Sequence, residues 1–444
     1  MKLTRDVIIS LLNLSLCVHL SQSTVMEKLK ESLPAVKEVY DEAQVIGEQL
    51  GKALDVAYNK IETNLNDSSV KWKTPELIRD SGYNFEAHEV TTEDGYILTL
   101  HRIPGPPNAP IVFLQHGITE SSSCWVLSGK GNALAYLLAD RGYDVWLGNA
   151  RGNIYSRGHV SLSVNDTQYW QFSWHEMGIY DIPAVLSYLT SIRNDKVIYI
   201  GHSMGTTMAY VMSILRPDAA QNVSAIYSLA PVAYCGHAKS PVRLVTPFLD
   251  EIELLSDYVA HGEFVPGNKL AQYVGMYLCD WLGVAFNGFC TEALFFLFGF
   301  DNKRFNDTLT PSIVAHTLAG SSIRELTHYG QLIKSHKFQR YDWGKEENKR
   351  VYGDDDPPEY DLSKVNVPVA LFWGRNDLLA DTRDVRKLRR ELPRVILDHP
   401  INYNKFNHID FLWGLDAKKL VYSPLIQLIE SFSLGRRSSR RPMG

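Results

Sequence analysis

The sequence predicts an α/β fold, in which a mostly parallel central sheet carries helices on both faces and a helical subdomain is inserted. Two observations predict it. From about residue 71, short continuous apolar runs alternate with helix-length stretches, which is typical of parallel strands buried on both faces. Glycine, serine and aspartate residues follow several of these runs, at the strand ends where such sheets bind ligands.

The predicted strands follow one another in chain order. FEAHEV (residues 85–90) and YILTLHRI (residues 96–103) form a hairpin around Glu93-Asp94-Gly95. The buried strands that follow lie within residues 111–117, 143–152, 196–203, 224–233, 367–377 and 395–401. Because helix-length stretches separate these runs, we expect the crossover connections of a parallel sheet.

The N-terminus is typical of a secretory signal peptide, which we place at residues 1–23. Lys2 and Arg5 precede the apolar run 7–20, and small residues follow it. The run is short and interrupted for a membrane span, although Asp6 weakens the basic flank and leaves a retained anchor as an alternative. We expect a protein of the secretory pathway without a transmembrane segment.

Two flanking segments lie outside the predicted α/β core. Residues 24–70 repeat apolar residues at three- and four-residue steps, which predicts an amphipathic helical extension. This extension either packs on the domain surface or serves as a propeptide or partner-binding helix. The basic residues 435–444 form a C-terminal tail that we expect to be solvated and frayed.

The composition limits the class of protein. An apolar content of 45% and a charged content of 21% over 444 residues are ordinary for a globular protein. The formal net charge of −5 gives no indication of nucleic-acid binding. N-glycosylation sequons agree with secretion, and they stand at Asn66, Asn165, Asn222 and Asn306. The sequence does not determine the oligomeric state.

The cysteines leave several pairings open. After removal of the signal peptide, Cys124, Cys235, Cys279 and Cys290 remain. In an oxidising compartment Cys279 and Cys290 could close a short loop, while the other two could pair or stay free.

The most informative motif is G-H-S-M-G, which places Ser203 between Gly201 and Gly205. A buried strand precedes it and a helix follows it. A G-x-S-x-G in this context holds a nucleophilic serine on a strained turn, where close contacts require glycine. The alternative is a glycine-rich turn with a surface serine.

A serine hydroxyl needs a base, usually a histidine oriented by a carboxylate. In chain order after Ser203, Asp377 is the candidate acid and His408 the candidate base. Asp381 competes with Asp377, which could instead cap a helix, and Asp410 could be a local partner of His408. Backbone N–H groups of Met204 and Ile118 are the candidate oxyanion donors, and no metal or organic cofactor is needed.

Residues 235–365, which we call the cap, interrupt the alternation and are rich in aromatic and aliphatic residues. A helical subdomain with its own core accounts for much of this density. The additional hypothesis is that the segment covers the active site and binds acyl chains on its inner face.

Taken together, these motifs resemble the acid lipase family of the α/β-hydrolases, the group that contains gastric and lysosomal acid lipases. The matching stretches cover residues 71 to about 434 and are EDGYILTLHRIP, VFLQHGI, WLGNARGN, FSWHEMGIYDIPA, GHSMG, LAPVA, HKFQRYDWG, NDLLAD and FNHIDFLWG. The core would then comprise residues 71–234 and 366–434.

The resemblance implies hydrolysis of fatty-acid esters. The strongly apolar cap indicates neutral lipids as substrates, triacylglycerol or cholesteryl ester, met at a lipid–water interface. The resemblance assigns nucleophile, acid and base to Ser203, Asp377 and His408, the oxyanion positions to Ile118 and Met204, and a cap disulfide to Cys279 and Cys290. The sequence departs from the family at Met204, where glutamine is usual, and at Phe298, where cysteine is common. A small-ester carboxylesterase and a non-catalytic lipid-binding protein are the rival functions.

Overall fold

The structure is a computed structural model that describes residues 73–264, 289–301, 303–305 and 309–439. The predicted signal peptide (1–23) and the whole of the extension (24–70) therefore lie outside the described residues. The main sheet runs in the order β1-β2-β4-β3-β6-β7-β10-β11, with the short strand β5 paired to β2. Its strands are β1 (Glu86–Thr91), β2 (Tyr96–Ile103), β3 (Ile111–Gln115), β4 (Asp144–Leu147), β5 (Gly158–His159), β6 (Val197–His202), β7 (Val223–Leu229), β10 (Val369–Trp373) and β11 (Val395–Pro400).

The sheet is mostly parallel, as predicted. Strands β4, β3, β6, β7, β10 and β11 pair in parallel, whereas β1, β2 and β5 pair antiparallel at one side. The parallel strands β3, β4, β6 and β10 are buried at every residue. This two-sided burial is why their sequences read as continuous apolar runs instead of alternating ones.

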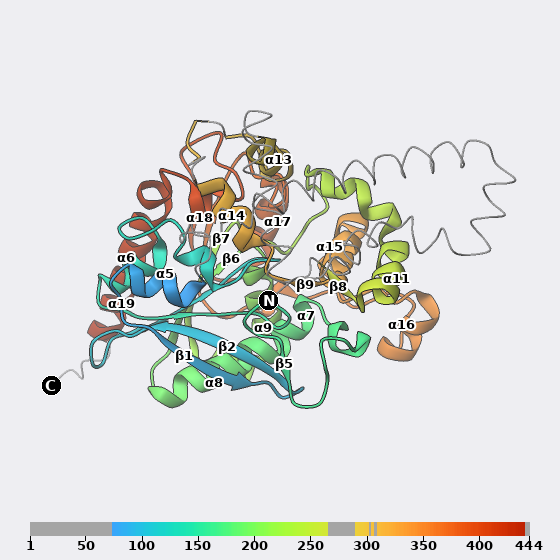
Figure 1. Cartoon of the computed structure of the whole chain (residues 1–444), viewed down its shortest axis with the longest axis horizontal. Helices are drawn as coiled ribbons and strands as arrows, with labels where there is room; N and C mark the ends of the chain where they lie inside the picture. Colours follow the sequence, from blue (N-terminus) through green and yellow to red (C-terminus); the bar gives the residue numbers. More distant parts are fainter. Residues whose placement is uncertain (1–72, 265–288, 302, 306–308, 440–444) are drawn as a thin grey trace, which may run out of the picture. The chain divides into compact units, whose positions relative to one another are not determined.

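Helices cover both faces of the sheet (Figure 1). Helices α8 (Ile182–Ile192) and α9 (Met204–Leu215) contribute to the core on one face, where Phe113 and Tyr199 point. Helices α6 (Leu134–Ala139) and α19 (Ser423–Ser439) contribute to the core on the other, with Val112 and Ile200. The remaining α-helices of this region are α5 (Thr74–Asp80), α7 (Trp174–Glu176), α10 (Pro217–Ala220), α17 (Thr382–Glu391) and α18 (Asp410–Trp413).

The cap segment is inserted between strands β7 and β10 and is mainly helical. Its described elements are η4 (Pro241–Phe248), α11 (Leu249–Ala260), β8 (Glu263–Phe264), α13 (Phe289–Phe298), α14 (Thr310–Thr317), β9 (Ser321–Ser322), α15 (Ile323–Ser335), α16 (Lys345–Tyr352) and η6 (Leu362–Lys364). Helices α11 and α15 lie side by side, and Arg324 on α15 pairs with Glu253 on α11 (Figure 1).

The C-terminal tail, predicted to be frayed from residue 435, is helical in the structure over its first residues. Helix α19 continues to Ser439, so the boundary placed at residue 435 falls inside a helix. Gly435 weakens a helix by only about 1 kcal/mol, which is not enough to end one. Residues 440–444 lie outside the described part.

Candidate active site

Ser203 occupies a strained turn between strand β6 and helix α9. Its φ of 51° and ψ of −119° lie outside the common regions for a residue with a side chain. The flanking glycines are required by close backbone contacts. A Cβ on Gly205 would lie 2.3 Å from the carbonyl oxygen of Gln115, and one on Gly201 would lie 2.8 Å from the carbonyl carbon of Gly205. The G-x-S-x-G spacing thus follows from the geometry of the turn.

His408 lies between Ser203 and Asp377 and contacts both. Its Nδ1 is 2.8 Å from Oδ2 of Asp377, and its Nε2 is 2.8 Å from Oγ of Ser203. A carboxylate only accepts, so Nδ1–H donates to Asp377 and Nε2 is left to accept the serine proton. The three side chains are buried. In the chain, Asp377 stands 31 positions from His408 and Ser203 stands 205 positions from it.

The segment after strand β10 fixes the Asp377 carboxylate. Oδ1 of Asp377 accepts backbone hydrogen bonds from Leu379 at 2.9 Å and Ala380 at 2.8 Å. Its other oxygen, Oδ2, contacts His408. These bonds hold the carboxylate in one orientation toward the imidazole.

The two predicted oxyanion donors lie beside the serine. Met204 is the residue after Ser203, and a Cβ on Gly117 would lie 3.1 Å from Cβ of Ser203, which places the turn before Ile118 against the nucleophile. Within the described residues, no acceptor takes a hydrogen bond from the backbone N–H of Ile118 or Met204. That both N–H groups are unpaired there is consistent with the predicted oxyanion role, which stays a prediction.

Comparison with known proteins identifies the chain. Residues 74–129 match the family described as a partial alpha/beta-hydrolase lipase region, and residues 110–273 match the alpha/beta hydrolase fold. The chain is 40% identical over 365 residues to Lipase 3 of Drosophila melanogaster, covering 80% of this chain and 92% of that protein. It is 38% identical to gastric triacylglycerol lipase of Homo sapiens, covering 80% and 90%.

A third relative, lipase lipl-1 of Caenorhabditis elegans, is 38% identical over 381 residues and covers 82% of this chain and 93% of its own length. The chain belongs to the acid lipase family of the α/β-hydrolases. The resemblance inferred from the motifs is confirmed. The chain is a carboxylic ester hydrolase.

Asp381 and Asp410, the two other candidate carboxylates of this acid lipase, have partners other than the His408 imidazole. Asp381 caps helix α17 by accepting from Arg383 N, and its carboxylate pairs with Arg383 and Lys239. Asp410 accepts from the backbone N–H of Asn407 at 2.8 Å. Neither carboxylate makes a hydrogen bond to the His408 imidazole, which Asp377 contacts.

Two residues that the motif analysis did not single out connect the parts of the site. His202 Nε2 lies 3.1 Å from the carbonyl oxygen of His408, so it can donate to the loop of the proposed base. Glu120 accepts from Gly117 N at 2.7 Å and lies 3.5 Å from His202 Nδ1. Burial raises the pKa of Glu120, but the facing His202 and the Gly117 hydrogen bond outweigh it and lower that pKa. No sequence signal marks this pairing, because the two residues are distant in the chain.

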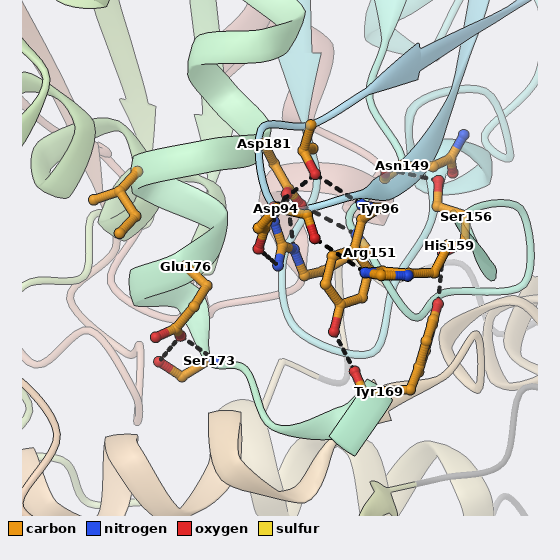
Figure 2. A network of polar contacts seen from close by, with 12 residues as sticks. Asp94, Tyr96, Asn149, Arg151, Ser156, His159, Tyr169, Ser173, Glu176 and Asp181 are labelled. Atoms are coloured by element: carbon orange, nitrogen blue, oxygen red, sulfur yellow. Dashed lines mark hydrogen bonds and ion pairs between the residues drawn. The ribbon is translucent and has the colours of Figure 1, made fainter. Parts of the chain in front are cut away.

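A second buried polar cluster surrounds Arg151 (Figure 2). The guanidinium forms two hydrogen bonds with Asp94, at 2.6 and 2.9 Å, and two with Asp181. It also lies over the ring of Tyr96, 3.9 Å from the centroid. Burial lowers the pKa of Arg151, but the two carboxylates outweigh it and hold that pKa above the ordinary value.

Other predicted sites of the acid lipase are only partly described. Cys279 and the side chain of Cys290 lie outside the described residues, as do Asn66 and Asn306. Cys124 and Cys235 are free and buried, Asn165 is exposed and Asn222 is partly exposed. In the described ranges, no group of three or more His, Cys, Asp or Glu could hold a metal ion, and no helix is long and apolar enough to cross a membrane.

Proposed function

We propose that this acid lipase hydrolyses fatty-acid esters of neutral lipids, triacylglycerol or cholesteryl ester, through an acyl-enzyme on Ser203. The observation that carries the proposal is the continuous chain of contacts from Ser203 through His408 to Asp377, with both imidazole distances at 2.8 Å. That chain has the order and roles of a serine-hydrolase triad.

The first half-reaction forms the acyl-enzyme. Ser203 Oγ attacks the ester carbonyl carbon while its proton passes to Nε2 of His408, and Asp377 stabilises the resulting imidazolium. The negative oxygen of the tetrahedral intermediate accepts from the N–H groups of Ile118 and Met204. His408 then returns the proton to the leaving alkoxide, and the C–O bond breaks to release the alcohol.

The second half-reaction repeats this path with water. The oxygen of a water molecule attacks the acyl carbon while His408 Nε2 takes a proton from that water. The second tetrahedral intermediate collapses when Ser203 Oγ leaves and regains the proton, which releases the fatty acid. Every step uses groups of this chain and needs no cofactor.

Apolar side chains on the cap support a lipid–water interface as the place of action. Leu244 and Phe248 on η4 and Phe296 on α13 are each more than half exposed, and so is Phe300 just after α13. Large exposed apolar residues of this kind are favoured where a protein meets a lipid surface. The exposed sequon Asn165 agrees with a secreted or lysosomal location.

The test is fatty-acid release from emulsified triacylglycerol and cholesteryl ester by the purified full chain, across acidic to neutral pH. Ser203→Ala should lower kcat at least about 10⁴-fold with an unchanged circular dichroism spectrum. Ser187→Ala, at an exposed position on α8, serves as the matched control and should keep wild-type activity.

Three results would contradict the proposal. Hydrolysis that survives in Ser203→Ala would remove the nucleophile assignment. Equal or better turnover of dissolved short-chain esters would favour a small-ester carboxylesterase. Binding of lipid without any hydrolysis would favour a lipid-binding protein.

A further inference from the structure

A short cap segment, Phe298–Asp301 at the end of helix α13, touches both loops that carry the proposed acid and base. The carbonyl oxygen of Phe298 accepts from the backbone N–H groups of Leu378 and His408, each at 3.4 Å. The Phe298 ring also lies nearly parallel to the His408 imidazole, with an interplanar angle of 13° and centroids 6.0 Å apart. One residue of the cap is therefore hydrogen-bonded to both loops, the one that carries the proposed acid and the one that carries the proposed base.

The next two residues extend this contact. The Gly299 carbonyl accepts from Nδ2 of Asn407 at 2.6 Å, and the Phe300 carbonyl accepts from Nδ2 of Asn376 at 2.9 Å. Asn376 and Asn407 directly precede Asp377 and His408 in the chain. Gly299 has a φ of 120°, and a Cβ there would lie 2.1 Å from the Asn376 carbonyl oxygen, so only glycine fits between the loops.

Asp301 ends the segment, and it meets Asp410 in a buried site. Oδ1 of Asp301 accepts from the Tyr403 hydroxyl at 2.8 Å, and Oδ2 of Asp410 accepts from Asn407 N at 2.8 Å. The other oxygens, Oδ2 of Asp301 and Oδ1 of Asp410, are buried and find no donor among the described residues. The two carboxyl groups lie within hydrogen-bonding contact of each other, and both residues are at most 1% exposed.

Two ionised carboxylates cannot stay in such contact without a cation, because burial and mutual repulsion both oppose the second charge. A single proton between them removes one charge and satisfies both orphaned oxygens. We propose that Asp301 and Asp410 share one proton, and that this shared proton holds the segment Phe298–Asp301 against the loops of Asp377 and His408. The inference rests on the proposed function, within which Asp301 and Asp410 are positioning residues.

The surrounding groups give the direction of the pH dependence. Burial raises the pKa of Asp410, and Asp301 and Asp377 raise it further against the lowering effect of the Asn407 N–H. Burial and the Asp301 hydrogen bond raise the pKa of Tyr403 to about 12, so its hydroxyl keeps its proton. Arg304, the cation facing Tyr403, is paired with Asp416.

Because the folded-state pKa of Asp410 exceeds the unfolded value, the stability contributed by the shared proton is complete below that unfolded value. It is lost as the pH rises through the folded pKa. The segment should therefore be held best at acidic pH and released at alkaline pH.

The test compares wild type with Asp410→Asn, whose amide can accept from Asn407 N and donate permanently to Asp301. Two profiles are measured from acidic to alkaline pH, the midpoint of thermal unfolding and the separate values of kcat and KM. We expect the alkaline decline of both midpoint and kcat to be reduced or lost in Asp410→Asn. Asp356→Asn makes the same substitution at an exposed position and should follow wild type.

A second pair of variants keeps the proposal open to refutation if Asp410→Asn does not fold. Asp301→Asn can accept from Tyr403 and donate to Asp410, so it should give the same profiles. Asp301→Ala removes the contact at every pH and should lower kcat about 10-fold to 100-fold with little change in KM, because the base is displaced while substrate binding is not.

The outcomes separate the two proposals. Unchanged alkaline declines in both Asn variants would overturn the shared proton. A changed thermal profile with an unchanged kcat profile would overturn the positioning role. If the wild type hydrolyses no ester, the proposed function fails, while the thermal profiles still support or overturn the shared proton.

Discussion

Two buried polar clusters in the α/β core differ in the kind of interaction that holds their groups together. Around Arg151, a cation lies between Asp94 and Asp181, and the carboxylates take hydrogen bonds from Nε and both Nη groups. At Ser203, the imidazole of His408 is held on one side by a carboxylate and on the other by a hydroxyl whose proton can move.

The comparison indicates what each arrangement can do. Opposite charges that satisfy each other fix a structure, since any change leaves an unpaired charge in the core. At the serine, the hydroxyl proton lies beside an imidazole nitrogen that can accept it, which suits the proton transfer of the proposed reaction. Ion pairing therefore favours stability in the first cluster, whereas a chain of hydrogen bonds with a transferable proton suits the chemistry proposed for the second.

The largest effect should come from Asp377→Asn, which removes the carboxylate that orients His408 in the serine cluster. An asparagine amide can donate to Nδ1, which favours the imidazole tautomer that cannot accept the Ser203 proton. We expect kcat to fall about 10⁴-fold while the free energy of unfolding changes little. Steady-state hydrolysis and urea denaturation measure the two quantities, and a loss of stability without a loss of kcat would reverse the roles assigned to the clusters.

Arg151→Met should have the opposite signature. The variant keeps an apolar stem but leaves Asp94 and Asp181 without their cation, so we expect unfolding to become easier by about 3–5 kcal/mol. Urea denaturation of the full chain measures this loss. Arg157→Met is the matched control, because Arg157 pairs with Glu263 but is 29% exposed, and it should cost no more than about 1 kcal/mol. Equal losses in the two variants would contradict the contrast.

The smallest effect is expected at Asp381, the aspartate that competed with Asp377 in the sequence. Asp381→Ala removes the cap of helix α17 and should lower the free energy of unfolding by about 1 kcal/mol with near-normal kcat. Parallel assays of Asp377→Ala and Asp381→Ala measure the distinction. A large drop in kcat for Asp381→Ala alone would move the acid from one residue to the other.

Much of this site could be predicted because its signals are local. The apolar runs indicated the buried strands, and Gly201 and Gly205 indicated a tight turn with no room for a side chain at those two positions. The order serine, aspartate, histidine then limited the candidates for acid and base. Asp377 and Asp381 could not be separated in this way, since both follow the same strand and both types of role suit aspartate.

What the sequence by itself determined is the set of elements and the turn at Ser203, because strand burial, helix periodicity and glycine requirements are properties of neighbouring residues. Only the tertiary structure decided which charged groups meet. Arg151 lies 57 positions from Asp94, and Asp301 lies over 100 positions from both Tyr403 and Asp410. Pairing of buried charges depends on distances of a few ångström between distant segments, and those distances exist only once the chain has packed.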